Sequence, residues 1–291
     1  MLTVQQLQGV ADVASVVARA AGTLIATSRP SRVEHKPGAS GLASQIVTDV
    51  DRAAERLIID HLPAEMDRFE LGLLTEETSD DGSRFDADAF WCIDPLDGTL
   101  PYSRGLAGYS VSIALVSRAG EPLVGVVFDP IGDVLYRAVR GGGTSVVGSV
   151  LAPCAPKRLR VCFDASMADV DGYDRVLGSL DEIATDLGLL GLDVALGSAG
   201  AVLNACHVLG DPPGCYFKFP KAEAGGGSVW DFAATACLFA EAGAVVSDMS
   251  GQPLQLNPKA STFMNRCGVL FASSEALSRA MRRRFPLGTA Q

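Results

Sequence analysis

The chain has 291 residues, 48% of them hydrophobic and 20% charged, which is the balance of a folded globular protein and not of a disordered one. Its formal net charge is -10, so we expect no nucleic-acid partner. Any phosphate-bearing ligand would need a cation between the phosphate and the protein's carboxylates. Its seven cysteines include no C-x-x-C pair, so we expect reduced thiols. No segment resembles a signal peptide or has enough uninterrupted apolar residues to cross a bilayer, so we expect no membrane partner and a cytoplasmic location.

The first half of the chain opens with two predicted helices and continues with strands. Hydrophobic residues recur at helical spacing over residues 7–25, and a second amphipathic helix is expected over residues 49–61, with Pro63 beyond its end. Between them, residues 28–41 are polar and rich in Pro and Gly, which predicts a loop or hairpin. Strand-like alternation follows at residues 71–76, 90–94, 109–117, 122–130 and 133–139.

The second half alternates between strands and helices. Strands are expected at residues 159–163 and 268–272, and helices at residues 173–187, 199–209 and 231–242. Strands first and alternation later predict layered sheets with helices packed between and outside them, an α+β or α/β arrangement. A boundary near residues 153–158 divides the chain into an N-terminal α+β subdomain, residues 1–155, and a C-terminal α/β subdomain, residues 156–291.

Acidic residues stand where three of these elements end or begin. Glu76 follows the apolar run LGLL, Asp94 and Asp97 lie in the turn of WCIDPLDGT after an apolar strand, and Asp231 opens a helix. Singly, each is more simply explained as a turn residue, a helix cap or a surface charge. Together they are a set of oxygen ligands suited to a hard divalent cation such as Mg2+.

These segments carry a family resemblance. WCIDPLDGT, with Glu76 and Glu77 upstream and WDFAATACLFAEAGAVVSD downstream, resembles the signature segments of the inositol monophosphatase superfamily of lithium-sensitive, Mg2+-dependent phosphatases. The resemblance runs from VTDVD, which begins at Val47, to the strand GVLFAS. It implies an αβαβα sandwich of the sugar-phosphatase type with two subdomains, two or three Mg2+ ions per active site, a small phosphorylated metabolite as substrate and a homodimer.

The resemblance also implies roles for individual residues. The metal ligands would be the side chains of Glu76, Asp94, Asp97 and Asp231 and the backbone carbonyl of Leu96.

Asp51 would pair with Thr99 to orient the attacking water, with Glu76 as a further catalytic residue. The simpler interpretation of Asp51 is a first-turn carboxylate in a helix capped by Thr48. Gly98 and Thr99 would offer backbone N–H groups to the phosphate. Metal-activated water would then displace the alcohol in line, without a covalent phosphoenzyme. One departure removes no ligand: Thr75 stands where the family usually has glycine before the two glutamates.

The substrate remains open between two branches of the superfamily. Hydrolysis of an inositol monophosphate-like ester is the first hypothesis, although Leu100 follows DGT where that branch has a polar residue. The segment YFKFP before the last acidic motif resembles instead the bisphosphate nucleotidases that act on 3'-phosphoadenosine 5'-phosphate, so Lys218 or Lys221 would contact a second phosphate. A buried strand whose lysine reaches solvent explains that segment equally well. A hypothesis of another class is a non-catalytic metal-binding regulatory module.

Overall fold

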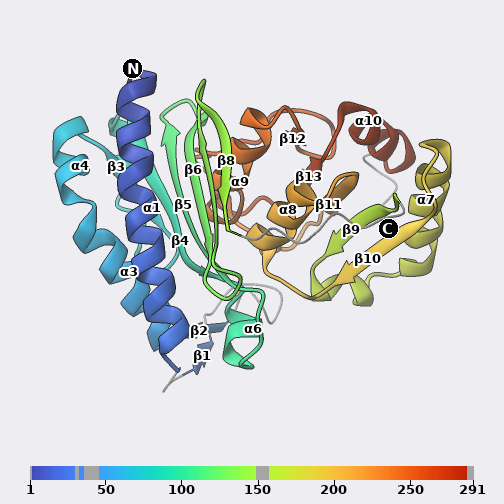
Figure 1. Cartoon of the computed structure of the whole chain (residues 1–291), viewed down its shortest axis with the longest axis horizontal. Coiled ribbons are helices and arrows are strands. Elements are labelled where there is room, and N and C mark those ends of the chain that lie inside the picture. Colours follow the sequence, from blue (N-terminus) through green and yellow to red (C-terminus); the bar gives the residue numbers. More distant parts are fainter. Residues whose placement is uncertain (1, 30–32, 36–45, 149–156, 287–291) are drawn as a thin grey trace.

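A computed structural model describes residues 2–29, 33–35, 46–148 and 157–286. Two β-sheets alternate with three groups of helices, so that five layers lie side by side (Figure 1). This arrangement confirms the αβαβα sandwich expected from the sequence. Some features of the sequence prediction lie outside the described residues: most of the boundary at residues 153–158, much of the loop at residues 28–41, and one of the seven cysteines, Cys154.

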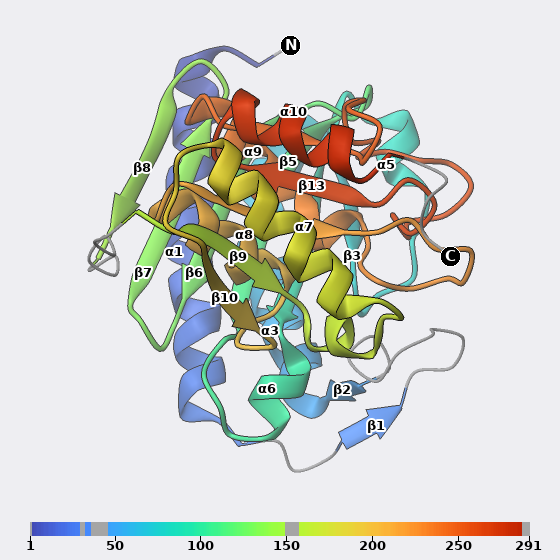
Figure 2. The ribbon, with the colours of Figure 1, turned by 90° about the vertical axis from the view of Figure 1, so that its right-hand side faces the viewer.

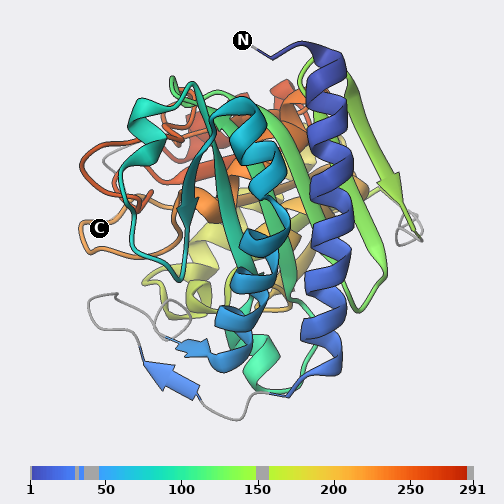
Figure 3. The ribbon, with the colours of Figure 1, turned by 90° about the vertical axis from the view of Figure 1, so that its left-hand side faces the viewer.

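The first outer layer covers one face of the larger sheet (Figure 3). It consists of three helices: α1 (Val4–Thr27), α3 (Asp49–His61) and α4 (Pro63–Phe69). Helix α1 begins with a capping box, in which the Thr3 hydroxyl accepts from the Gln6 amide and the Gln6 side chain accepts from the Thr3 amide. Its buried stripe packs on strands of the sheet and on α3, as the spacing of its apolar residues predicts.

The larger sheet has six strands in the order β3-β4-β5-β6-β7-β8. They are β3 (Gly72–Thr75), β4 (Ala89–Asp97), β5 (Ser110–Ser117), β6 (Pro122–Asp129), β7 (Val134–Val139) and β8 (Gly143–Val147). Only the pairing of β3 with β4 is parallel. Short helices follow the first two strands, α5 (Ser83–Asp86) and α6 (Thr99–Ser103). A separate pair, β1 (Val33–His35) and β2 (Ile46–Thr48), is antiparallel.

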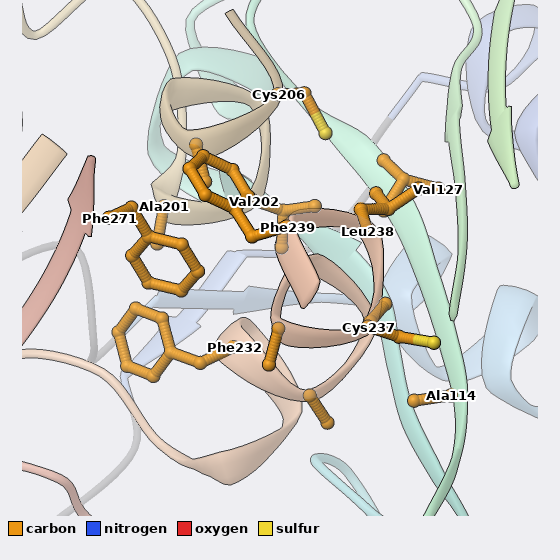
Figure 4. Close-up of a cluster of buried hydrophobic side chains, with 14 of the residues drawn as sticks. Ala114, Val127, Ala201, Val202, Cys206, Phe232, Cys237, Leu238, Phe239 and Phe271 are labelled. Atoms are coloured by element: carbon orange, nitrogen blue, oxygen red, sulfur yellow. The ribbon is translucent and has the colours of Figure 1, made fainter. Parts of the chain in front are cut away.

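The middle layer consists of α8 (Ala201–Gly210) and α9 (Val229–Glu241), both of them mostly apolar and buried. Helix α9 lies so close to the larger sheet that a Cβ on Gly125 would be 2.2 Å from the Ala234 carbonyl oxygen. Phe232 and Phe239 of α9 point toward Phe271 of the smaller sheet (Figure 4). The two sheets therefore share one core through these helices.

The smaller sheet has five strands in the order β10-β9-β11-β13-β12. They are β9 (Leu159–Phe163), β10 (Leu192–Leu196), β11 (Gly214–Lys218), β12 (Val245–Ser247) and β13 (Val269–Ala272). Its outer face is covered by α7 (Tyr173–Asp186) and α10 (Glu275–Arg284) (Figure 2). The 3-10 helix η1 (Ala165–Asp169) follows β9.

Some elements differ from the sequence prediction. Pro63 lies beyond the end of α3, as expected, but it also begins α4, a helix that the sequence analysis did not predict; its missing N–H costs nothing there. Strand β8, which begins at Gly143, was not among the predicted strands. Among the described residues, α1 is long and apolar enough to cross a membrane by length and composition alone. Asp12 and Arg19 interrupt its apolar residues, and its buried face belongs to the core.

Candidate metal centre

Asp94 and Asp97 lie at the C-terminal end of β4, a strand in which all nine residues are buried. Side chains of a regular strand alternate between the two faces, so residues three apart would point to opposite sides of the sheet. Here the pairing shifts: Asp94 lies opposite Ser112 of β5, and Asp97 lies opposite Ser110. Three steps along β4 therefore match two along β5, and this bulge lets both carboxylates face the same side.

Asp231 joins these two residues from the middle layer. One carboxylate oxygen from each of Asp94, Asp97 and Asp231 can be chosen so that all three lie within 4.8 Å of one another. Asp231 sits in the first turn of α9, where its Oδ2 accepts from the Ser228 amide at 2.5 Å and completes a capping box. Asp231 is therefore both a capping residue of α9 and a member of the acidic cluster.

Backbone amides of α8 hold Asp97 in position. Its Oδ1 accepts from the Ala201 N–H at 3.1 Å and its Oδ2 from the Val202 N–H at 3.0 Å. This helix start is favourable for a negative charge because its first N–H groups have no partner within the helix. The contact needs a glycine before the helix, since a Cβ on Gly200 would lie 2.2 Å from the Asp97 Oδ2.

The three carboxylates are an unfavourable group in the absence of a cation. Burial raises the pKa of Asp94, and the charges of Glu76, Asp231 and Asp97 raise it further. Burial likewise raises the pKa of Asp97 and of Asp231. No N–H or O–H group among the described residues donates to the buried Asp94 Oδ2 while the neighbouring carboxyls are ionised; Asp94 and Asp231 can hydrogen-bond only when one of them is protonated. A buried acceptor without a donor, aimed into a cluster of carboxylates, fits a hard divalent cation such as Mg2+.

Glu76 is brought to this cluster by the parallel pairing of β3 and β4. Thr75 lies opposite Ile93, and the Glu76 amide continues the ladder by donating to the Ile93 carbonyl oxygen at 3.2 Å. Asp94 is the next residue on β4. Burial is the main cause of the raised pKa of both Asp94 and Asp51, and the charge of Glu76 adds to it. The three acidic segments therefore lie near one another, although the carboxylates that come within 4.8 Å are those of Asp94, Asp97 and Asp231 and do not include Glu76.

Asp51 and Thr99 also meet, although 48 residues separate them. The Asp51 Oδ1 accepts from the Thr99 hydroxyl at 3.0 Å. The Asp51 Oδ2 accepts from the Thr48 amide at 2.9 Å, so Asp51 caps its helix as well. The Thr99 hydroxyl also lies 3.1 Å from the Leu96 carbonyl oxygen. Gly98 adopts a positive φ of 87°, and a Cβ there would lie 2.7 Å from the Gly108 carbonyl oxygen.

Lys218 lies beside the acidic cluster on the smaller sheet. Its Nζ is 2.6 Å from the Asp164 Oδ2, and its side chain is 18% exposed. Burial lowers the pKa of Lys218, but the charges of Asp164, Asp231 and Asp97 outweigh burial and raise it. Lys218 and Asp164 also line a cavity of about 1120 Å3, and so does Lys221.

Three residues of this region were missed by the sequence analysis. Glu55 accepts hydrogen bonds from the loop that carries Glu76, Asp164 holds Lys218, and Gly200 permits the contact with Asp97. Asp164 also accepts from the hydroxyl of Tyr216 at 3.1 Å. A glycine before a helix was the one available signal for Gly200; the other contacts join distant segments and leave no local pattern.

The fold and this site define a layered αβαβα protein with an acidic centre suited to divalent cations, and comparisons with known proteins agree. A model of the inositol monophosphatase family matches residues 6–283. Nus factor SuhB of Escherichia coli K12 is 33% identical over 263 residues, covering 82% of this chain and 85% of SuhB. The chain therefore belongs to the inositol monophosphatase family.

Solved structures repeat the fold. The inositol monophosphatase of Anabaena sp. PCC 7120 has a TM-score of 0.64 and 26% identity, covering 97% of this chain and 98% of that one. An IMPase/NADP phosphatase complexed with NADP and Ca2+ has a TM-score of 0.71 and covers 100% of this chain and 98% of that one. At 17% identity, the second likeness concerns the fold alone.

Proposed function

We propose that this protein is a Mg2+-dependent phosphomonoesterase that hydrolyses a small soluble phosphate ester with water as the nucleophile. The observation that carries the proposal is the convergence of Asp94, Asp97 and Asp231 within 4.8 Å, together with the unpartnered buried oxygen of Asp94. Bound Mg2+ would polarise the phosphoryl group and lower the pKa of water. Glu76 and the Leu96 carbonyl oxygen would complete the ligand set for two or three ions.

The Asp51–Thr99 pair supports the choice of water as the nucleophile. The Thr99 hydroxyl has one proton and two acceptors within reach, Asp51 and the Leu96 carbonyl oxygen. While it donates to Asp51, its lone pairs stay free to accept a hydrogen bond from a water, which fixes how that water is oriented. Glu76 would share in accepting the proton of the attacking water. The backbone of Gly98 and Thr99 would contact the phosphate.

A second anionic group on the substrate is the alternative that one observation favours. Lys218 lines the cavity of about 1120 Å3 and interacts with the charges of Asp97 and Asp231, although none of the three clustered carboxylates lines that cavity. Five cationic and four anionic side chains line it, in a chain whose net charge is -10. Lys218 and Lys221 would therefore meet a second phosphate, as in 3'-phosphoadenosine 5'-phosphate.

Phosphate release distinguishes these substrates. The panel contains inositol 1-phosphate, 3'-phosphoadenosine 5'-phosphate, fructose 1,6-bisphosphate and glycerol 2-phosphate, each with and without Mg2+ and Li+. We expect Mg2+-dependent release, inhibited by Li+, from at least one ester. If a bisphosphate is preferred, Lys218→Met should reduce kcat/KM for that substrate more than for inositol 1-phosphate. An equal loss of kcat/KM on both substrates would mean that Lys218 is a structural ion-pair partner of Asp164 and does not contact a second phosphate.

The non-catalytic module predicts a different result. It predicts that Mg2+ binds, as measured by calorimetry, while no ester in the panel is hydrolysed. We favour the enzyme because the proposed ligands and the Asp51–Thr99 pair are all present in the chain. A homodimer and a cytoplasmic location belong to the same proposal, and light scattering on the purified protein measures the first directly.

A further inference from the structure

Glu55 lies one helical turn after Asp51 on α3 and is buried, with 4% of its surface exposed. Its carboxylate accepts three hydrogen bonds from the last residue of β3 and the segment that follows it. Oε2 accepts from the Thr75 hydroxyl at 2.5 Å and from the Glu77 amide at 2.8 Å, and Oε1 accepts from the Thr78 hydroxyl at 2.5 Å. These donors offset the cost of burying a carboxylate.

The donors come from both sides of Glu76. Thr75 precedes it, and Glu77 and Thr78 follow it, while the Glu76 amide itself is fixed to the Ile93 carbonyl oxygen of β4. The backbone around Glu76 is thus held by β4 on one side and by α3 on the other. Beyond Thr75 the chain leaves the strand, so the bonds to Glu55 replace a ladder that no longer continues.

We propose that Glu55 is a positioning residue: through Thr75 and Thr78 it fixes the loop that presents Glu76 to the metal centre. The inference rests on the proposed function, because Glu76 is a metal ligand only there. It also explains why this chain has threonine at position 75: the hydroxyl supplies a donor that glycine lacks. Hydrogen-bond partners behind a metal ligand typically change metal affinity or activity by about 10- to 100-fold.

Thr75→Val tests the inference because valine keeps the shape and the β-branching of threonine and removes only the donor. We expect the variant to bind Mg2+ about 10-fold more weakly by calorimetry, and Thr75→Ser to return to within about threefold of the parent. Thr144→Val is the matched control: Thr144 donates to the Leu238 carbonyl oxygen from β8, at the opposite edge of the same sheet, and its loss should leave Mg2+ affinity unchanged.

Variants of Glu55 separate the effect of its hydrogen bonds from the effect of its charge. Glu55→Gln keeps an acceptor for Thr75 and Glu77, and its amide group can donate to the Thr78 hydroxyl, so we expect Mg2+ affinity within about threefold of the parent. Glu55→Met removes all three bonds and should weaken Mg2+ binding at least as much as Thr75→Val does. Thr78→Val, on an exposed loop residue, gives the same test if a core variant fails to fold.

Four outcomes are informative. Parent-like Mg2+ affinity in Thr75→Val, Thr78→Val and Glu55→Met would overturn the inference, even if these variants were less stable to urea. A large loss in Glu55→Gln would also overturn it, in favour of a direct effect of charge. If the parent hydrolyses no ester but the variants still bind Mg2+ more weakly than the parent does, the role of Glu55 in positioning Glu76 is supported and the proposed phosphatase function is wrong. A parent that binds no Mg2+ would remove both.

Discussion

Asp94→Asn should stabilise the metal-free protein. Each pair of full charges at 4.8 Å repels by about 3.5 kcal/mol at an effective dielectric constant of about 20. Asp94 has two such neighbours, Asp97 and Asp231. Proton uptake by these carboxyls relieves part of the repulsion, so we expect the free energy of unfolding to rise by about 1–3 kcal/mol. Asparagine keeps the acceptor for the Leu96 amide, and its amide group places a donor where the unpartnered Oδ2 stood.

The assay is urea unfolding in EDTA and again in Mg2+. Ligand at 100 times its Kd stabilises the folded state by about 2.7 kcal/mol. We therefore expect the parent to gain stability in Mg2+ and the variant to gain little, so that their order is reversed. Phosphate release should fall to background in Asp94→Asn.

Asp164→Asn is the matched control, because it also neutralises one aspartate near the centre. It removes the ion-pair partner of Lys218, so it should destabilise the metal-free protein. The reasoning is refuted if Asp94→Asn destabilises the metal-free protein as much as Asp164→Asn does. That result would mean that the clustered carboxylates do not repel one another.

Two further predictions concern pH and a close contact. Because burial and neighbouring charges raise the pKa of Asp94 and Asp97 above the usual 3.8, folding takes up protons. The stability of the metal-free protein, measured by urea unfolding in EDTA, should therefore fall as the pH rises above 3.8. Mg2+ affinity should increase over the same range. A rise in the stability of the metal-free protein would contradict this prediction. Gly200→Ala places a Cβ against Asp97 and should lower kcat/KM about 100-fold, whereas Gly178→Ala, with open space around it, should have no effect. Retained activity in Gly200→Ala would show that Asp97 can move without loss.

Periodicity predicted the elements whose environment is uniform along their length. Helix α1 buries one stripe and β4 buries both faces, so their patterns are clear in the sequence. Strand β8 was missed because it is an exposed edge strand that begins at Gly143 and has no buried face to impose alternation. Strand β10 was missed for a related reason, since it too is an edge strand with mixed exposure.

The acidic motifs could be found in the sequence, but the geometry that joins them could not. The sequence marked Asp94 and Asp97 as a pair, yet the bulge that turns both to one side depends on pairing with Ser110 and Ser112 of β5. For Asp51, the sequence set a helix-cap role against a role beside Thr99, and the structure has both contacts. Contacts such as those of Glu55 with the loop after β3 depend on tertiary packing alone.

Because α9 lies so close to the larger sheet, few substitutions are tolerated where the two meet. At Gly125 there is no room for a side chain, because a Cβ there would lie 2.2 Å from the Ala234 carbonyl oxygen and 2.9 Å from the Cys237 Cβ. A larger residue on either side would roll or lift the helix, and Asp231 would move with it, away from Asp94 and Asp97. Residues at this contact touch no carboxylate, yet they determine where Asp231 lies because the helix moves as a rigid body. A saturation scan should find them as intolerant as the acidic residues themselves.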